Sequence, residues 1–158
     1  ATVSAAHYGV GNGLTRTVLT LTAVPVTITD NGANGSGGVK IYDFPECIFV
    51  SIAASANCTV AYGSVTDANV IASLGSVVAA ADATLTSTEA NIIPSTSAAT
   101  TSGAGTFAGD STAVTVLNGT STAVDLYLNL ATSTDPSTNN SATVSGTITL
   151  IWANGGDN

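Results

Sequence analysis

The chain has 158 residues, of which 8% are charged, against about 25% in ordinary soluble domains. Its formal net charge is -8, and Arg16 and Lys40 are its only cations. This composition excludes a basic patch for nucleic acid and argues against an anionic membrane surface as a partner. Because 44% of the residues are hydrophobic, the low charge does not indicate disorder. The length predicts one domain, and the many small and hydroxyl-bearing residues favour strands over exposed helices.

Residues 1–14 have no clear hydrophobic period and contain three glycines. We interpret them as an N-terminal arm, extended or looped, whose distinctive side chains are His7 and Tyr8. Such an arm often lies on a neighbouring subunit. Ala1 is expected to follow an initiator Met that has been removed, with cleavage of a leader as the alternative.

The segment 15–29 predicts a strand, or two strands with a bend at Pro25. Its apolar residues fall into two sets of opposite parity. Leu19 and Leu21 occupy odd positions, whereas Val24, Val26 and Ile28 occupy even positions. A change of parity inside one strand indicates a bulge or a change of sheet. Proline supports a bulged or edge position because it cannot donate to a ladder.

A turn-rich loop at 30–38 is followed by a predicted strand at 39–44. The strongly apolar run 47–54 predicts a central strand, and the short run 58–62 is expected to pair with it across a turn.

Cys47 and Cys58 are the only cysteines. Their spacing is not that of a metal motif, and two thiols cannot fill a structural zinc site. Buried thiols are the simpler interpretation, and a disulfide is the alternative if the two face each other on neighbouring strands.

Apolar residues in 65–87 recur at intervals of three and four residues, which is the spacing of a helix. Gly75 and the shortage of charge weaken that pattern, so one loose helix and short strands both stay open. Residues 89–94 are interpreted as an ordered turn or connector. The low-complexity segment 95–110 predicts a long exposed loop with Phe107 as its one anchor.

A strand at 113–117 is followed by an Asn-Gly turn and by a closing hairpin over 121–152. Both arms of this hairpin alternate apolar and polar residues, so each arm buries one face and exposes the other to water. The count is about seven to nine short strands with long loops. The sequence therefore predicts an all-β chain, a jelly-roll-like antiparallel β-sandwich over 15–153, with a polar tail at 154–158.

Groups suited to catalysis are few. His7 is the one histidine, and no nucleophile elbow occurs among the abundant serines. Asp43, Glu46 and Asp125 are more simply solvated acids than a catalytic pair. We therefore expect no enzyme activity, no metal and no cofactor. The remaining chemistry is surface: small residues and hydroxyls on strands form close contacts at low side-chain entropy cost, which suits a subunit of a repeated assembly.

Several passages resemble the decoration (cement) proteins of tailed bacteriophages, which are encoded near the major capsid protein. They are GVGNGLTRT at 9–17, KIYDFPE at 40–46, TEANIIPS at 88–95, TAVDLYLNL at 122–130 and GTITLIW at 146–152. The similarity spans most of the chain, departs most in 95–110, and includes no chemical signature.

This resemblance implies a trimeric jelly-roll sandwich at three-fold positions of the outer virion surface, where it bridges subunits of the major capsid protein. It also implies assembly in the bacterial cytoplasm with reduced cysteines. The candidate contacts with the capsid or with another subunit are His7, Tyr8, Arg16 and Phe107. For Arg16, the alternative is a local ion pair with an aspartate.

A rival hypothesis is a secreted or surface adhesin, or a pilus subunit, that binds glycans. A leader in the full gene or a disulfide between Cys47 and Cys58 would favour this rival. A gene that begins at a Met just before Ala1 would favour the virion protein. An enzyme such as a glycan hydrolase is disfavoured by the scarcity of histidine and paired acids.

Overall fold

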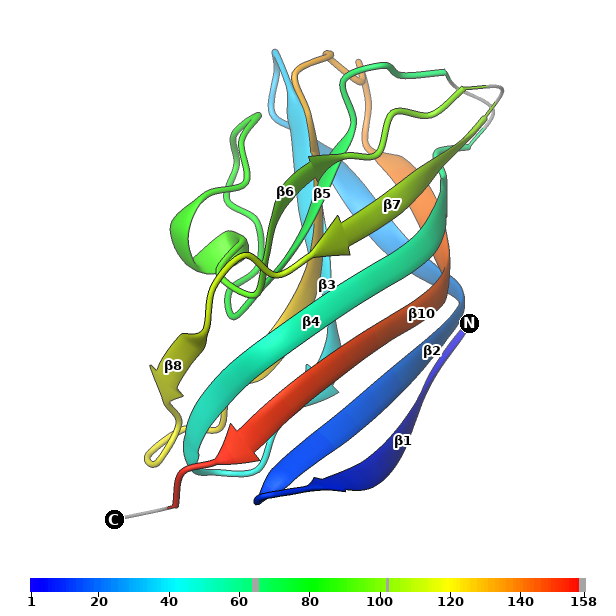
Figure 1. Cartoon of the computed structure of the whole chain (residues 1–158). Helices are drawn as coiled ribbons and strands as arrows, with labels where there is room; N and C mark the ends of the chain where they lie inside the picture. Colours follow the sequence, from blue (N-terminus) through cyan, green and yellow to red (C-terminus); the bar gives the residue numbers. More distant parts are fainter. Residues whose placement is uncertain (64–65, 102, 157–158) are drawn as a thin grey trace.

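The computed structural model describes residues 1–63, 66–101 and 103–156. It is an antiparallel β-sandwich, which confirms the predicted fold class (Figure 1). The described residues form ten strands rather than seven to nine, and three of them have 14 to 17 residues. The strands are β1 (Thr2–Gly11), β2 (Leu14–Asp30), β3 (Gly35–Asp43), β4 (Ile48–Ala61), β5 (Ile71–Gly75), β6 (Ile93–Ser97), β7 (Ala104–Asp110), β8 (Thr115–Asn118), β9 (Asp125–Thr132) and β10 (Asn140–Asn154), with a 3-10 turn at Ser87–Glu89.

The strands form one curled sheet in the order β6-β5-β9-β3-β2-β10-β4-β7, with β1 added to β2 and β8 added to β4. The first layer consists of β1, β2, β10, β4, β7 and β8, and the second of β3, β9, β5 and β6. Strand β2 connects the layers, because its last residues, Thr29 and Asp30, pair with β3. The core lies between the two layers (Figure 1).

The parity change predicted in 15–29 is a β-bulge. The register between β2 and β10 shifts where Val144 faces Val24 and Gly146 faces Leu21. Ala23 at this point has φ +48° and donates its N–H to Ser145 Oγ at 2.8 Å. The extra residue turns both apolar sets of β2 toward the core, where all are buried.

An aromatic cluster closes the core at the end of the sandwich near the chain's C-terminus. The ring of Phe44 lies 4.1 Å from that of Phe49 and 5.2 Å from that of Trp152, measured between centroids. These residues come from the end of β3, from β4 and from β10, so the cluster joins the two layers. Tyr42 packs edge-on against Phe44 at 4.8 Å.

The predicted closing hairpin is wrong in its pairing, although both of its strands exist. Strand β9 pairs with β3 and β5, whereas β10 pairs with β2 and β4. The two arms therefore lie in opposite layers, and their apolar faces meet across the core. The connection at 133–139 crosses between layers, which lets each long arm pair along its length with a different neighbour.

Residues 48–61 of this segment form one long strand, β4, rather than two strands joined by a turn. Cys47 precedes this strand and Cys58 lies within it, and both are buried. Eleven residues of extended chain span roughly 35 Å, while a disulfide requires Cα atoms within about 7 Å. The two cysteines therefore cannot be joined to each other in this fold, and the interpretation as buried thiols is confirmed.

The helical alternative for 65–87 is wrong where the structure describes this segment, and residue 65 lies outside the described residues. Strand β5 occupies its centre and pairs on both sides, with β6 and β9. A strand buried on both faces is apolar throughout, so it can imitate helical spacing over a few residues. The ordered connector expected at 89–94 is confirmed only in part, because Ile93 and Pro94 begin β6. Glu89 caps the 3-10 turn before it by accepting from the Thr86 N–H at 3.1 Å.

The exposed loop predicted over 95–110 is also wrong, with residue 102 outside the described residues. Strand β7 occupies 104–110 and pairs with β4 from Ala104 to Asp110. Small residues permit this packing: a Cβ added to Gly105 would lie 2.4 Å from the carbonyl oxygen of Ala99. Low sequence complexity here reflects close contact between backbones rather than exposure.

The chain ends are more ordered than expected. Residues 2–11 form β1, paired with β2 from Thr2 to Gly11. In the predicted tail, Ile48 N–H donates to Gly156 O at 2.8 Å and Gly155 N–H donates to Ile48 O at 2.7 Å. Residues 157 and 158 of that tail lie outside the described residues.

Candidate interaction surface

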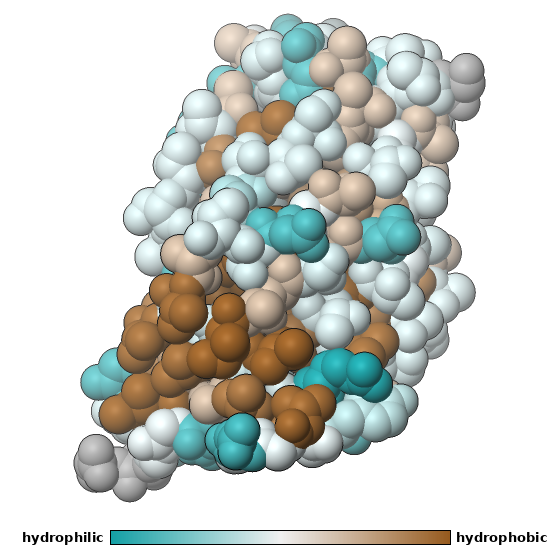
Figure 2. All heavy atoms as spheres, viewed as in Figure 1, coloured by the Kyte–Doolittle hydropathy of each residue, from teal (hydrophilic) through white to brown (hydrophobic). Residues whose placement is uncertain are grey.

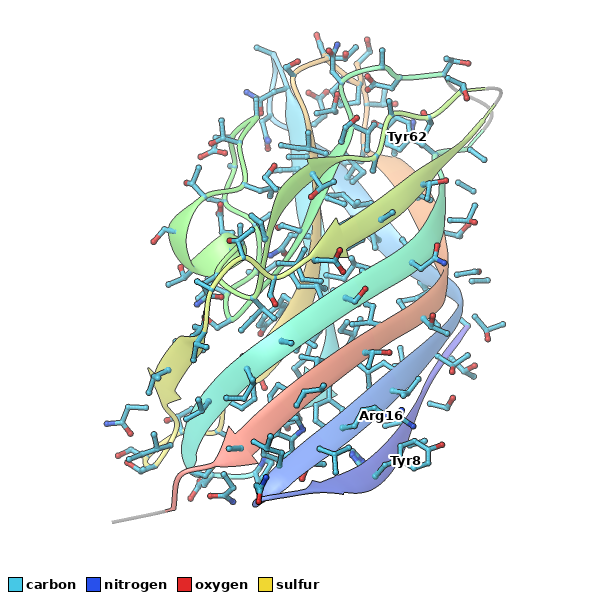
Figure 3. All side chains as sticks on the ribbon, in the orientation of Figure 1. Tyr8, Arg16 and Tyr62 are labelled. Carbon is cyan, nitrogen blue, oxygen red and sulfur yellow. The ribbon has the colours of Figure 1, made fainter. Side chains whose placement is uncertain are left out.

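The β1–β2 hairpin brings Tyr8 and Arg16 together. They are direct partners in the antiparallel register, and the guanidinium carbon of Arg16 lies 4.6 Å from the ring centre of Tyr8. Figure 3 shows both side chains at the same end of this hairpin. Among the described residues, both ion pairs belong to Lys40. Within the described residues Arg16 belongs to neither ion pair and makes this cation–π contact with Tyr8.

His7 contacts the core side of the same hairpin. Its Nδ1 lies 2.9 Å from Thr17 Oγ1, and its Nε2 lies 3.4 Å from the Tyr42 hydroxyl. Thr17 Oγ1 in turn accepts a hydrogen bond from the Trp152 indole N–H at 2.9 Å. This chain of contacts anchors β1 to the aromatic cluster, so His7 positions the strand, while Tyr8 is presented outward.

Phe107 does not belong to the exposed surface. It lies on β7 opposite Cys58 and is 0% exposed. The sequence correctly identified it as an anchor, but it anchors a strand to the core and is unavailable to a capsid or a neighbouring subunit. Because Phe107 is buried, its expected role as a contact residue is corrected to that of a core anchor.

Strand β1 forms an open sheet edge. All of its residues are exposed, and it pairs only with β2. Its sequence, TVSAAHYGVG, has no lysine, carboxylate or proline. Soluble proteins normally protect such an edge with charge, proline or a bulge, because unpaired backbone N–H and C=O groups attract another strand. The pairing of β1 with β2 has a register shift only near the turn, between Gly9 and Gly11. The edge from Thr2 to Gly9 is therefore open to pairing with another strand.

The outer face of the first layer is almost without charge. Its six strands contain only three charged residues, Arg16, Asp30 and Asp110. Exposed apolar side chains gather at one end: Val114 is 57% exposed, Val116 is 62% and Ile52 is 38%. Figure 2 shows this apolar patch over β8 and the neighbouring ends of β4 and β10. Apolar patches on an otherwise polar surface mark interaction sites.

The outer face of the second layer, by contrast, is covered by the chain itself. Asn129 on β9 was expected to face water, yet it is 0% exposed. Its Nδ2 donates to Val77 O and to Glu89 O, both at 2.9 Å, and its Oδ1 accepts from Ala79 N–H at 2.9 Å. Segment 76–92 is thus held over this layer, and the first layer has the bare face.

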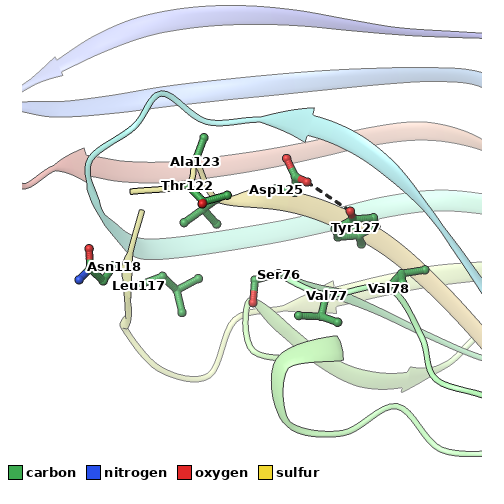
Figure 4. Close-up of a pocket in the computed structure, with 10 residues that line it drawn as sticks. Ser76, Val77, Val78, Leu117, Asn118, Thr122, Ala123, Asp125 and Tyr127 are labelled. Carbon is green, nitrogen blue, oxygen red and sulfur yellow. Dashed lines mark hydrogen bonds between the residues drawn. The ribbon is translucent and has the colours of Figure 1, made fainter. Parts of the chain in front are cut away.

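A pocket of about 380 Å³ lies where segment 76–78 approaches the start of β9 (Figure 4). Val77, Val78 and Leu117 form an apolar wall, with Asp125 and Tyr127 at one side. Tyr127 donates its hydroxyl to Asp125 Oδ2 at 3.2 Å. Burial raises the pKa of Tyr127, and the neighbouring Asp125 carboxylate raises it further.

The acids singled out from the sequence are partly brought together. Asp43 and Asp125 are direct partners across β3 and β9. Lys40 lies between them, 3.2 Å from Asp125 Oδ1 and 3.6 Å from Asp43 Oδ2. The hydrogen bond that Lys40 donates to Asp125 and the charges of both aspartates raise the pKa of Lys40. This is an exposed ion-pair cluster, and Glu46 takes no part in either ion pair.

Within 1–63, 66–101 and 103–156, no cluster of three or more His, Cys, Asp or Glu side chains could hold a metal ion. Over the same residues, no helix has the length and hydropathy needed to cross a membrane.

Comparison with known proteins finds similarity at the level of structure alone. No family model matches the chain, and no curated protein matches it. The resemblance to tailed-phage decoration proteins therefore stays a prediction.

Among solved structures, the chain is similar to VP2 of infectious bursal disease virus in a subviral particle, at 10% identity and a TM-score of 0.43, over 91% of this chain and 34% of that one. A mutant VP2 in derived T=1 particles is similar at 13% identity and a TM-score of 0.41, over 95% of this chain and 36% of that one. The chain thus spans about a third of the length of these viral proteins.

Proposed function

We propose that this chain is a virion structural protein, a decoration protein that binds the outer shell of the major capsid protein and stabilises it. The observation that carries the proposal is the open, unprotected edge of β1 beside a bare and nearly uncharged sheet face. The resemblance of the sequence to decoration proteins supplies the identity of the assembly.

The edge of β1 suits attachment by strand addition. A strand of the shell that pairs with β1 would satisfy its outward backbone groups without bringing charges out of water. Short side chains such as Ser4, Ala5 and Ala6 lose little rotamer entropy on contact. His7 holds β1 in place through Thr17, so the edge is pre-organised before binding.

Attachment to a shell also benefits from repetition. Several copies that are joined to one another act together, so weak individual contacts yield strong retention. The resemblance implies a trimer at three-fold positions as one such arrangement on the shell.

The test uses undecorated shells assembled from the major capsid protein encoded beside this chain, with binding measured by co-sedimentation. Val3→Lys places a charge on the β1 edge, while Val77→Lys makes the same change on an exposed surface away from it. The wild type and Val77→Lys are expected to sediment with shells, and Val3→Lys is expected to stay in solution.

Two outcomes would overturn the proposal in different ways. A wild-type chain that stays in the supernatant at saturating shell concentration would remove the decoration role. Binding that is equal for all three proteins would retain that role and remove β1 as the attachment edge. Matching far-UV circular dichroism of the three proteins establishes that the substitutions leave the fold intact.

The rival role as a secreted adhesin loses one of its supporting features. An oxidised pair of Cys47 and Cys58 would have favoured it, and their positions along one strand do not permit that bond.

A further inference from the structure

The two outward charges near the middle of the first layer lie on opposite sides of its face. The register passes from Asp110 on β7 to Ser55 on β4, then to Thr149 on β10 and Val18 on β2. Arg16 lies two residues from Val18 on β2, so it is displaced by one outward position from this row. Both charged side chains are exposed, and β4 and β10 separate them.

We propose that two copies of this chain pack through the outer faces of their first layers. The two copies are related by a two-fold axis that lies between β4 and β10 and runs parallel to these strands. Rotation about that axis exchanges the β2 side of the face with the β7 side. Arg16 of each copy then meets Asp110 of the other. The one cation and the one acid on opposite sides of the face make it complementary to itself, as an interface with two-fold symmetry requires.

The same rotation keeps the apolar end of one face against the apolar end of the other. Two outward positions further toward this end, a row runs from Val116 on β8 to Val50 on β4, Ala153 on β10 and Leu14 on β2. The axis lies between Val50 and Ala153, so Val116 of one copy lies over Leu14 of the other. Val116 is the most exposed large apolar side chain among the described residues, and this contact removes it from water.

Charge and shape both favour a second copy as the partner. Two chains of net charge -8 repel each other, so a contact between copies must use a surface poor in carboxylates, and this face has that property. Near the axis, Ala53, Ser55, Thr149 and Ile151 line a shallow hollow of about 240 Å³. Small side chains there let two sheets approach to the roughly 10 Å spacing of packed sheets.

The face is large enough for a stable dimer. Four strand spacings of about 4.8 Å, multiplied by the 14 residues of β4 at about 3.3 Å each, give a plane of roughly 900 Å². A stable interface of standard size buries about 800 Å² on each partner. This pairing goes beyond the proposed attachment to a shell, which uses the β1 edge, and it differs from the three-fold assembly that the resemblance implies.

Sedimentation equilibrium of the purified full chain tests the proposal. The wild type is expected at twice the mass of one chain. Arg16→Asp and Asp110→Arg each create two like-charge contacts per dimer. Each substitution is expected to raise the dissociation constant of the dimer by about tenfold or more. The double variant with both changes restores opposite charges and is expected to return to within about threefold of the wild type.

Matched controls separate this interface from general effects of charge. Asp135→Arg makes the same charge change as Asp110→Arg in the exposed connection between β9 and β10, and it should leave the dimer unchanged. Val116→Asn should weaken the dimer, whereas Val77→Asn should not.

A monomeric or trimeric wild type would overturn the proposal. A dimer that tolerates both single charge reversals, or a double variant that fails to recover, would also overturn it. Measurement without shells keeps this result separate from the test of capsid binding.

Discussion

The indole Nε1–H of Trp152 donates to Thr17 Oγ1 at 2.9 Å, which joins the last long strand to the first core strand. Both residues are buried, and the same oxygen lies 2.9 Å from Nδ1 of His7. One threonine hydroxyl thus satisfies a buried donor and also anchors β1, the strand that carries the proposed attachment edge.

Thr17→Val tests this relationship with little change of volume. The substitution leaves the Trp152 N–H without its acceptor in the core, so we expect unfolding to require about 1–3 kcal/mol less free energy. Urea titration followed by tryptophan fluorescence measures this loss, since Trp152 is the only tryptophan. Thr17→Ser keeps the hydroxyl and should lose less. Equal stability of the valine variant and the wild type would contradict the assigned role.

Gly146 is expected to tolerate no side chain. Its φ is +143°, and an added Cβ would lie 2.3 Å from the Asn57 carbonyl oxygen and 2.7 Å from Cys58 Cα. Gly146→Ala must displace backbone of β4, so we expect a loss of about 2–4 kcal/mol in the free energy of unfolding. Gly9→Ala is the control, because no atom lies within 4 Å of its added Cβ. A thermal melt in which both variants match the wild type would contradict this account of the bulge.

Phe107→Ala distinguishes a core anchor from a surface contact. Removal of a fully buried aromatic ring leaves a cavity and is expected to cost about 3–5 kcal/mol. Val77→Ala, at an exposed position outside the proposed interfaces, is expected to change stability by less than about 0.5 kcal/mol. Chemical denaturation of both variants measures the difference. A small effect at position 107 would return this residue to the surface.

Cys58 should be inert toward thiol reagents in the folded protein at pH 8. Burial raises the pKa of its thiol to about 11 from the ordinary value of 9.0, and its Sγ lies 3.7 Å from the Thr147 carbonyl oxygen. Ellman's reagent should therefore react with Cys58 only after unfolding, because the thiolate is the reactive form. Rapid labelling of Cys58 in the native protein, identified by mass spectrometry, would contradict its burial.

The same shift predicts a loss of stability at high pH. From about pH 9 to about pH 11, the unfolded chain releases the Cys58 proton while the folded chain retains it, so stability falls as pH rises. The contribution is fully present below pH 9 and is on the order of 2 kcal/mol. Cys58→Ala should reduce the slope of stability against pH in this window. Burial also raises the pKa values of Tyr42 and Tyr62, which are present in both proteins. The measurement is therefore the difference in this slope between the wild type and Cys58→Ala.

Residue periodicity correctly predicted the class of the fold and several local features. Alternation in β9 and β10 is visible in the sequence, because successive side chains of a strand point to opposite faces. The bulge in β2 was predictable for the same reason, since both apolar sets had to reach one core. Of the candidate contacts, Tyr8 and Arg16 are exposed as expected, and no feature of the local sequence indicated that they stack on each other.

The local sequence pattern does not indicate which strands pair with each other. The alternating residues indicate that β9 and β10 are strands with one apolar face each, and the composition leaves almost no charge to place on them. The folded structure was needed to establish that the two strands lie in opposite layers, that Asn129 is buried beneath segment 76–92, and that Arg16 and Asp110 flank one bare face. Alternation depends on neighbours along the chain, whereas strand order depends on which distant faces pack most closely, and that competition is settled by the whole core.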